Sequence, residues 1–223
     1  MAASARVIAH IRTQLRAAAD PARAPVLQAY LKSSMPCLGV RVPEVRSLVR
    51  QCTADVLDAD VLQQVALELW RSAEFREERH AALAIMALRP LRGDPATLPV
   101  HEEMIRTGAW WDLVDEAAHR LRELLDANPA QLAVTMRIWA DDEDLWIRRA
   151  AIICQIGRRD ATDRELLEYA IEANIDDSEF FIRKAIGWAL RELGKSDPDW
   201  VRTFAARRPL SPLSRREALK HLG

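Results

Sequence analysis

The residues best suited to chemistry are a carboxylate and an aromatic ring at helical spacing. Trp111 and Asp115 are four positions apart, so in a helix their side chains share one face. A fixed carboxylate stabilises positive charge developing on a sugar and can orient or deprotonate a water molecule. Tryptophan faces attract cations. This pair therefore suits a reaction in which positive charge develops on the substrate. The structural alternative is that Trp110 and Trp111 are both core residues and that Asp115 forms a salt bridge with a repeat arginine.

A triplet of the form charged-x-Ala recurs five times along the chain. The copies begin at Arg79, Asp115, Arg149, Arg183 and Arg216, so their first residues lie 36, 34, 34 and 33 positions apart. A nearly constant period of this size is typical of a solenoid of helical hairpins, in which equivalent positions line one surface. Four members are arginines and one is an aspartate. We therefore expect a groove for a polyanion with one reactive position at Asp115.

The elements that must position these residues are expected to be helices throughout. Ala, Leu, Arg and Glu are abundant, whereas only seven of the 223 residues are glycine, a composition that favours helix. Helices are expected at about 4–19, from 25, and at about 43–53, 58–71, 74–88, 98–107, 111–126, 129–140, 144–156, 162–173, 178–193, 198–207 and 213–222. We expect a single repeat domain over residues 1–223, with N-terminal helices at about 4–54 and repeats at about 58–223.

Charge is distributed unevenly along the chain. Residues 1–54 carry 8 Lys and Arg against 2 Asp and Glu, residues 55–144 carry 9 against 19, and residues 145–223 carry 15 against 12. The ends are therefore basic and the middle is acidic, with a total of −1. This total counts mildly against a nucleic-acid ligand, whereas the repeated arginines would gather positive charge on one face.

Several other functions are poorly supported. The three cysteines and five histidines show no metal-ligand spacing, so we expect free thiols, no metal and no cofactor. Only four lysines are present, and none lies near Asp115, which argues against a Schiff-base mechanism. His119 follows Asp115 by four residues and is a possible partner to it, although an exposed helical histidine is the commoner case. The N-terminus has no signal-peptide core and no stretch resembles a membrane span, so a cytoplasmic location is expected.

Several motifs in series resemble the alkylpurine DNA glycosylase D family. They are residues 110–115 (WWDLVD), 146–152 (WIRRAAI), 180–188 (FFIRKAIGW), 209–218 (PLSPLSRREA) and the early segment 38–44 (LGVRVPE). The resemblance covers essentially the whole chain in the right order. It implies an all-α fold, a right-handed-type α-α superhelix of HEAT-like repeats. It also implies a monofunctional DNA glycosylase of base excision repair that removes N3- and N7-alkylated purines from duplex DNA.

The resemblance assigns the residues of the reaction by motif. The catalytic aspartate of the family corresponds to Asp115, the second acid of the first motif. Its tryptophans beside the lesion correspond to Trp111 and Trp188. A tyrosine on the second helix of the family corresponds to Tyr30.

The resemblance also assigns a contact to DNA phosphates. The arginine immediately before Ala-Ala-Ile in the family corresponds to Arg149, and the adjacent Arg148 is a second candidate for the same contact. We call the first residues of the five triplets the repeat column. Its other arginines, which are Arg79, Arg183 and Arg216, are further expected phosphate-binding residues. The expected partner is duplex DNA containing alkylated purines, bound by a monomer that does not associate with membranes.

Two other functions remain open from the sequence. One is a non-catalytic binder of distorted or branched DNA, against which the presence of Asp115 with Trp111 argues, because a carboxylate facing phosphate weakens binding. The other is an α-solenoid scaffold for a protein partner, a common use of such repeats. The acidic middle of the chain suits a basic partner, whereas the arginines suit DNA.

Overall fold

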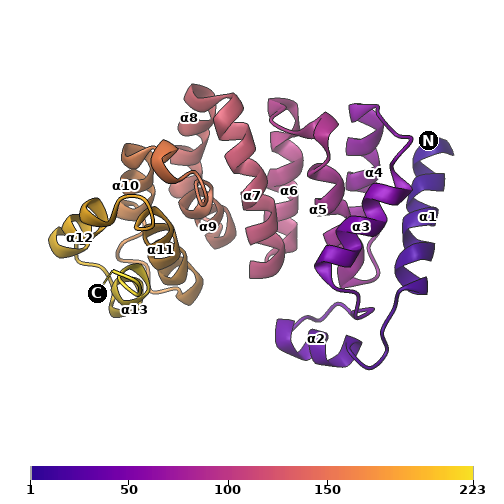
Figure 1. The fold of residues 1–223 in the computed structure, drawn as a ribbon, viewed down its shortest axis with the longest axis horizontal. Coiled ribbons are helices and arrows are strands. Elements are labelled where there is room, and N and C mark those ends of the chain that lie inside the picture. The colour runs from indigo at the N-terminus through magenta and orange to yellow at the C-terminus, as the bar shows by residue number, and fades with distance from the viewer. Residues whose placement is uncertain (1, 223) are drawn as a thin grey trace. The chain divides into compact units, whose positions relative to one another are not determined.

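The computed structural model describes residues 2–222, which form thirteen α-helices and three short 3-10 helices (Figure 1). Within these residues there is no strand, so the predicted all-α class is confirmed. The chain forms two compact units, Met1–Val100 and His101–Gly223. The prediction of one repeat domain over the whole chain stays a prediction. In the described part of the chain, every helix is too short or too polar to cross a bilayer.

The first unit is built on α1 (Ala2–Ala17), α3 (Val42–Cys52), α4 (Ala59–Arg71) and α5 (Arg76–Met86), with the short α2 (Ala24–Leu31) beside them. Helix α1 packs on α3 and α4, and α5 packs on the same two helices. Their apolar faces form a core that includes Ile11, Leu15, Leu62, Leu69 and Trp70. Proline near the start of α2 and of α3 suits a first helical turn, where no N–H is needed.

A buried carboxylate fixes the loop between α2 and α3. Glu77 accepts hydrogen bonds from the backbone N–H groups of Leu38, Gly39 and Val40, at 2.8, 2.8 and 3.2 Å. Gly39 has φ +85°, and a Cβ there would lie 2.4 Å from the carbonyl oxygen of Asp20. Only glycine fits this position. The non-helical segment expected before residue 43 is therefore an ordered connection.

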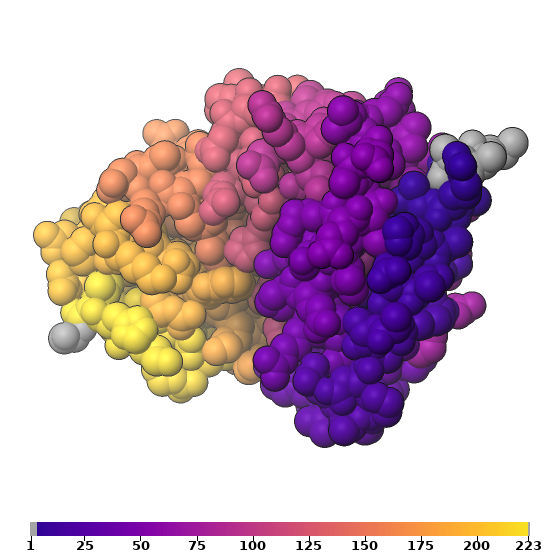
Figure 2. Space-filling view, turned by 45° about the vertical axis from the view of Figure 1, so that its right-hand side comes forward, coloured from indigo at the N-terminus to yellow at the C-terminus, as the bar shows by residue number. Residues whose placement is uncertain are grey.

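The second unit contains most of α6 (Leu98–Gly108) and the seven helices after it. These are α7 (Trp111–Ala127), α8 (Pro129–Ala140), α9 (Leu145–Ile153), α10 (Arg164–Glu172), α11 (Phe180–Leu193), α12 (Pro198–Arg207) and α13 (Pro212–Ala218). Helix α9 packs between α7 and α11, and α11 also packs against α13. Figure 2 shows the yellow chain of α12 and α13 lying against the orange α11.

The triplets that recur in the sequence lie on helices of this series. Asp115 lies on α7, Arg149 on α9, Arg183 on α11 and Arg216 on α13. Each of these four triplets therefore occupies one helix of a series, α7, α9, α11 and α13, in which neighbours pack side by side. The alanines that complete the triplets are buried, including Ala117, which is fully inaccessible. Small side chains at these positions let the helices approach closely.

The predicted helix boundaries are confirmed within a few residues except at two C-terminal ends. Helix α9 ends at Ile153, earlier than the expected 156, because the chain turns at Gly157, which has φ +91°. Helix α13 ends at Ala218, earlier than the expected 222. The carbonyl of Leu222 instead accepts a hydrogen bond from Arg202, at 2.9 Å. The N-terminal ends were more predictable because caps such as Asp144 and Asp163 bind backbone N–H groups.

The cysteines are all free thiols, as expected. Cys37 and Cys154 are buried. Burial raises the pKa of Cys154 to about 12, so this thiol stays protonated at neutral pH and is a poor nucleophile.

Candidate active site

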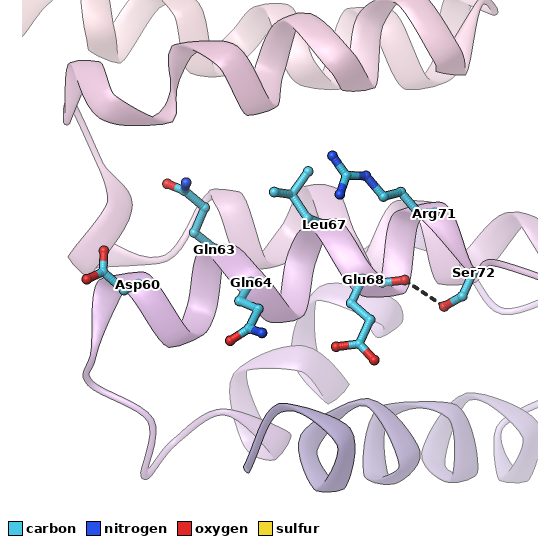
Figure 3. Close-up of a pocket in the computed structure, with 7 residues that line it drawn as sticks. All are labelled: Asp60, Gln63, Gln64, Leu67, Glu68, Arg71 and Ser72. Atoms are coloured by element: carbon cyan, nitrogen blue, oxygen red, sulfur yellow. Dashed lines mark hydrogen bonds between the residues drawn. The ribbon is translucent and has the colours of Figure 1, made fainter. Parts of the chain in front are cut away.

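A hollow in the first unit is lined by α4 and by Ser72, which follows it, and contains none of the predicted site residues. It has a volume of about 540 Å³ and is lined by Asp60, Gln63, Gln64, Leu67, Glu68, Arg71 and Ser72 (Figure 3). Figure 3 shows Gln64 and Glu68 on the opposite side of the helix from Leu67 and Arg71. Ser72 Oγ donates to the Glu68 carbonyl at 2.6 Å. This hollow follows the exposed side of one helix and offers no arrangement suited to glycosidic cleavage.

The predicted reactive carboxylate lies in the second unit, early in α7. Trp110 precedes the helix in an extended conformation, with φ −157° and ψ 144°. Leu113 and Val114 are fully buried, as is Ala117. These residues fix the inner face of α7. The side chain of Asp115 lies beside this face and retains 15% of its accessible surface.

Asp115 forms a bidentate ion pair with Arg149 of the next repeat. Arg149 Nε lies 2.8 Å from Oδ1 of Asp115, and Arg149 Nη2 lies 2.8 Å from Oδ2. The same guanidinium donates through Nη1 to the Phe181 carbonyl at 2.6 Å. One side chain from α9 thus links α7 to α11. The salt bridge that the sequence left as an alternative is confirmed, and its partner is Arg149.

An aromatic cluster lies beside this ion pair. The ring of Phe181 is 5.5 Å from Trp110 and 5.0 Å from Trp146, centroid to centroid. The guanidinium carbon of Arg149 lies 5.8 Å from the Phe181 ring centre. Trp110 therefore belongs to the packing of the site, as the sequence alternative proposed. Its partial burial leaves Nε1 without a hydrogen-bond partner among residues 2–222.

The two tryptophans predicted to face the lesion are both half-buried. Trp111 is the first residue of α7, one turn before Asp115. Trp188 lies on α11, and its ring meets that of His119 from α7 at 6.4 Å and 85°. Because His119 is one turn after Asp115, the ion pair and Trp188 flank the same stretch of α7. The structure thus places Trp111, Asp115, His119 and Trp188 along one helix and its neighbours.

The arginines of the predicted phosphate column differ in their bonding. Arg148 donates to the carbonyls of Asp142 and Glu143, each at 2.8 Å, to Asn174 Oδ1 at 3.0 Å and to Asp177 Oδ2 at 2.9 Å. All of its nitrogens are therefore used to join α9 to the turns around it. The contacts of Arg148 and Arg149 with phosphate stay predictions.

The next two members of the column, Arg183 and Arg216, form no ion pair with any residue that the structure describes. Arg183 is half-buried and Arg216 is exposed. Within residues 2–222 neither side chain makes an ion pair, and Nε of Arg183 is buried without a hydrogen bond. The neighbouring Lys184 is paired with Glu217 at 3.2 Å. Arg183 and Arg216 therefore keep their charges available to a ligand.

Two predicted site residues belong to the first unit. Tyr30 lies on α2 and is 70% exposed. The guanidinium carbon of Arg79 lies 4.8 Å from the centre of the Trp70 ring. Burial, and then the charge of Arg76, lower the pKa of Arg79. Their contacts with a lesion and with phosphate stay predictions.

The sequence assigned Asp115 and Arg149 to one column but gave them separate roles. Opposite charges at equivalent positions of adjacent repeats were a signal that the two side chains touch. The carbonyl of Phe181 as the third member had no signal in the sequence, because backbone acceptors depend on helix packing. The aromatic cluster of Trp110, Trp146 and Phe181 depends on helix packing in the same way.

Comparisons with known proteins identify the family of the chain. The model of the family described as DNA alkylation repair enzyme matches residues 11–222. A search of curated proteins gave no match. A solved structure described as a predicted DNA alkylation repair enzyme from Enterococcus faecalis is 27% identical, with a TM-score of 0.82 over 92% of this chain and 97% of that chain.

Two further structures are similar in fold. The smu.31 protein of Streptococcus mutans UA159 is 19% identical, with a TM-score of 0.63 over 81% of this chain and 92% of its own. AlkD2 from Streptococcus mutans is 18% identical, with a TM-score of 0.62 over 82% of this chain and 90% of its own. With these matches, the predicted class of HEAT-like helical repeats is confirmed. The family match assigns the protein a role in the repair of alkylated DNA. The chain belongs to the DNA alkylation repair enzyme family.

Proposed function

We propose that this protein is a monofunctional DNA glycosylase that hydrolyses the N-glycosidic bond of N3- and N7-alkylpurines in duplex DNA. The observation that carries the proposal is the Asp115–Arg149 pair, in which the carboxylate is fixed at both oxygens yet keeps 15% of its surface accessible. Trp111 lies one turn away on the same helix. Membership of the family supports a substrate in alkylated DNA.

The chemistry of the substrate requires little from the protein. Alkylation at N3 or N7 makes the purine cationic, so the base leaves as a neutral molecule and needs no general acid. The barrier is the positive charge that develops on the deoxyribose, as in glycoside hydrolysis. Asp115 would stabilise that charge and orient or deprotonate the attacking water.

Arg149 has a positioning role in this mechanism. Its two hydrogen bonds at 2.8 Å hold the carboxylate plane, and its bond to the Phe181 carbonyl holds the guanidinium. The sugar would approach the accessible part of Asp115, closer to the carboxylate than to the guanidinium, so the net interaction with a cation stays attractive.

The surrounding residues would bind the substrate. The faces of Trp111 and Trp188 attract a cationic base or electron-poor sugar, each contributing about 0.5–2 kcal/mol. Arg183 and Arg216, which make no ion pair among the described residues, have charges suited to the flanking phosphates. Phosphate contacts set the position of the protein on the duplex without reading sequence. Arg79, Arg148 and Arg149 remain candidates for further contacts, and Tyr30 for a contact near the lesion.

The test is the release of N7-methylguanine from a defined duplex under single-turnover conditions. We expect release by the wild-type protein and a loss of several orders of magnitude in Asp115→Asn. A matched control is Asp197→Asn, which weakens the Arg164–Asp197 pair in the same unit, away from the proposed site residues. The control should release the base at nearly the wild-type rate.

The alternative functions are outcomes of the same experiment. Salt-dependent binding of duplex DNA without base release by the wild-type protein would favour the non-catalytic binder. Absence of both binding and release would favour the protein scaffold. Base release that is unchanged in Asp115→Asn would show that the Asp115–Arg149 pair is only structural.

A further inference from the structure

His119 connects two helices that do not otherwise pack closely. It lies on α7, one turn after Asp115, and its ring meets Trp188 of α11 with 6.4 Å between centroids and planes at 85°. Helices α7 and α11 both pack against α9 between them. The imidazole and the indole therefore meet across the position of α9, on which Ala150 and Ala151 are buried small residues.

The perpendicular arrangement restricts both rings. Edge-to-face packing is one of the preferred geometries of aromatic pairs. Trp188 is half-buried, so its accessible part is the part that a ligand can contact. Because a ring from another helix packs against it, the plane of the indole depends on His119 as well as on α11.

The charges around His119 on its own helix partly cancel. Burial is the main cause that lowers its pKa; Glu116 and Asp115 raise the pKa, and Arg120 and Arg122 lower it. The imidazole is consequently neutral at neutral pH.

Within residues 2–222, most charged groups on the neighbouring helices have a partner, and the exception on α11 is Arg183, five residues before Trp188, which makes no ion pair. On α9, the charge of Arg149 is matched by Asp115. On α11, Lys184 and Arg191 lie four residues before and three after Trp188, and they share the single carboxylate of Glu217 of α13, so one positive charge is left over. On α8, the guanidinium of Arg137 lies 4.8 Å from the ring centre of Tyr169.

We propose that His119 is a positioning residue for Trp188: its neutral imidazole holds the indole plane in place for a cationic alkylpurine, and its protonation weakens the site. The proposal rests on the proposed function, because it gives Trp188 the task of contacting the base or sugar. An imidazolium beside the indole competes with the cationic base for the ring. The same charge one turn from Asp115 opposes the positive charge that develops on the sugar.

The first test does not depend on glycosylase activity. The indole N–H resonance of Trp188 in the ¹⁵N-labelled full chain is assigned with Trp188→Phe and followed from about pH 8 to about pH 5. We expect the resonance to shift with a single midpoint below about 6.5, the ordinary histidine value. The shift should be absent in His119→Gln and retained in the control His221→Gln, which removes an exposed histidine.

The second test measures single-turnover release of N7-methylguanine across the same pH range. We expect the wild-type rate to fall below the midpoint found by NMR. His119→Gln should lose this acid limb and react roughly two- to tenfold more slowly at neutral pH, from the usual size of an aromatic pair. His119→Phe keeps an aromatic ring without a titrating group, so it should restore the rate and still lack the acid limb.

The outcomes separate this proposal from the proposed function. A Trp188 resonance that titrates equally in His119→Gln would overturn the positioning role whatever the enzymatic result. The wild-type protein could instead release no base while its Trp188 resonance still shifts with the titration of His119. This result would overturn the proposed glycosylase function but would support the coupling between the His119 and Trp188 rings. Unchanged rate and acid limb in His119→Gln would show that the ring contact has no effect on the reaction. Thermal unfolding of each variant verifies that it is folded.

Discussion

Arg149 holds both oxygens of Asp115 from the neighbouring helix, with Nε–Oδ1 and Nη2–Oδ2 distances of 2.8 Å each. The arginine side chain is 6% exposed and the aspartate side chain 15%. Breaking one side of such a pair leaves a charge in a poorly hydrated place. The pair therefore has a structural function as well as any catalytic one, and the first two predictions separate the two functions.

Asp115→Asn should fold but lose base excision by orders of magnitude. The amide still accepts one hydrogen bond from Arg149, so we expect the free energy of unfolding to fall by only about 1–3 kcal/mol. DNA affinity should stay the same or rise, because a negative charge is removed. Denaturant unfolding, duplex binding and single-turnover release are measured on one preparation. Excision near the wild-type rate would assign Asp115 to structure alone.

Arg149→Ala tests whether this arginine acts on phosphate or on Asp115. A lost phosphate contact would weaken binding to all duplexes equally and reduce the salt slope by about one unit. Because its donors are used by Asp115 and Phe181, we expect a larger loss of excision than of binding. In a double-mutant cycle with Asp115→Asn, the two stability losses should be coupled by about 0.5–3 kcal/mol. Additive losses and a reduced salt slope would favour the phosphate contact.

Arg183→Ala and Arg216→Ala should each weaken binding to damaged and undamaged duplex alike. Both side chains lack an ion pair within the described residues, so each can neutralise one phosphate. The expected change is a reduction of the salt slope by roughly one unit per substitution. The control is Arg202→Ala on α12, an exposed arginine paired with Asp199 outside the triplet series. Equal effects of all three substitutions would mean that binding reflects overall charge.

The helices were predictable because the signals that define them are local. Proline, aspartate caps and apolar periodicity fixed most helix starts to within a few residues, as at Asp144 and Pro198. The repeat period also placed Asp115, Arg149 and Arg183 on alternate helices, which are α7, α9 and α11. Which partner each charge selects depends on packing between helices. The sequence therefore could not show that Arg148 and Arg149, adjacent in the chain, bond to the turns around α9 and to Asp115 respectively.

The protein should lose stability in mild acid because of His101. Burial, and then the charge of Arg120, lower the pKa of His101 to about 4, whereas the unfolded chain has a histidine value of about 6.5. Between these values the unfolded state binds more protons, so the free energy of unfolding falls as the pH falls through this range. Comparing about pH 6.5 with about pH 5, we expect a His101 contribution on the order of 2 kcal/mol.

The variant His101→Leu isolates this contribution. Its denaturant unfolding should depend less on pH than that of the wild type over the same range, while carboxylates that titrate lower contribute equally to both proteins. An identical pH dependence in the two proteins would show that His101 is hydrated or paired in the folded state.

Substrate choice should follow the charge of the leaving base. We expect release of cationic N3- and N7-alkylpurines, but not of neutral lesions such as hypoxanthine or uracil. Neutral bases depart as anions unless they are protonated, and the site offers no group placed to do so. Asp115 must be ionised for its proposed role, and His119 is neutral because burial lowers its pKa. Neutral lesions also lose the attraction between a cationic base and Trp111 or Trp188.

Matched duplexes carrying one N7-methylguanine, one hypoxanthine or one uracil are compared under single-turnover conditions. Comparable release of hypoxanthine or uracil would require a general acid and would overturn the mechanism based on Asp115 alone.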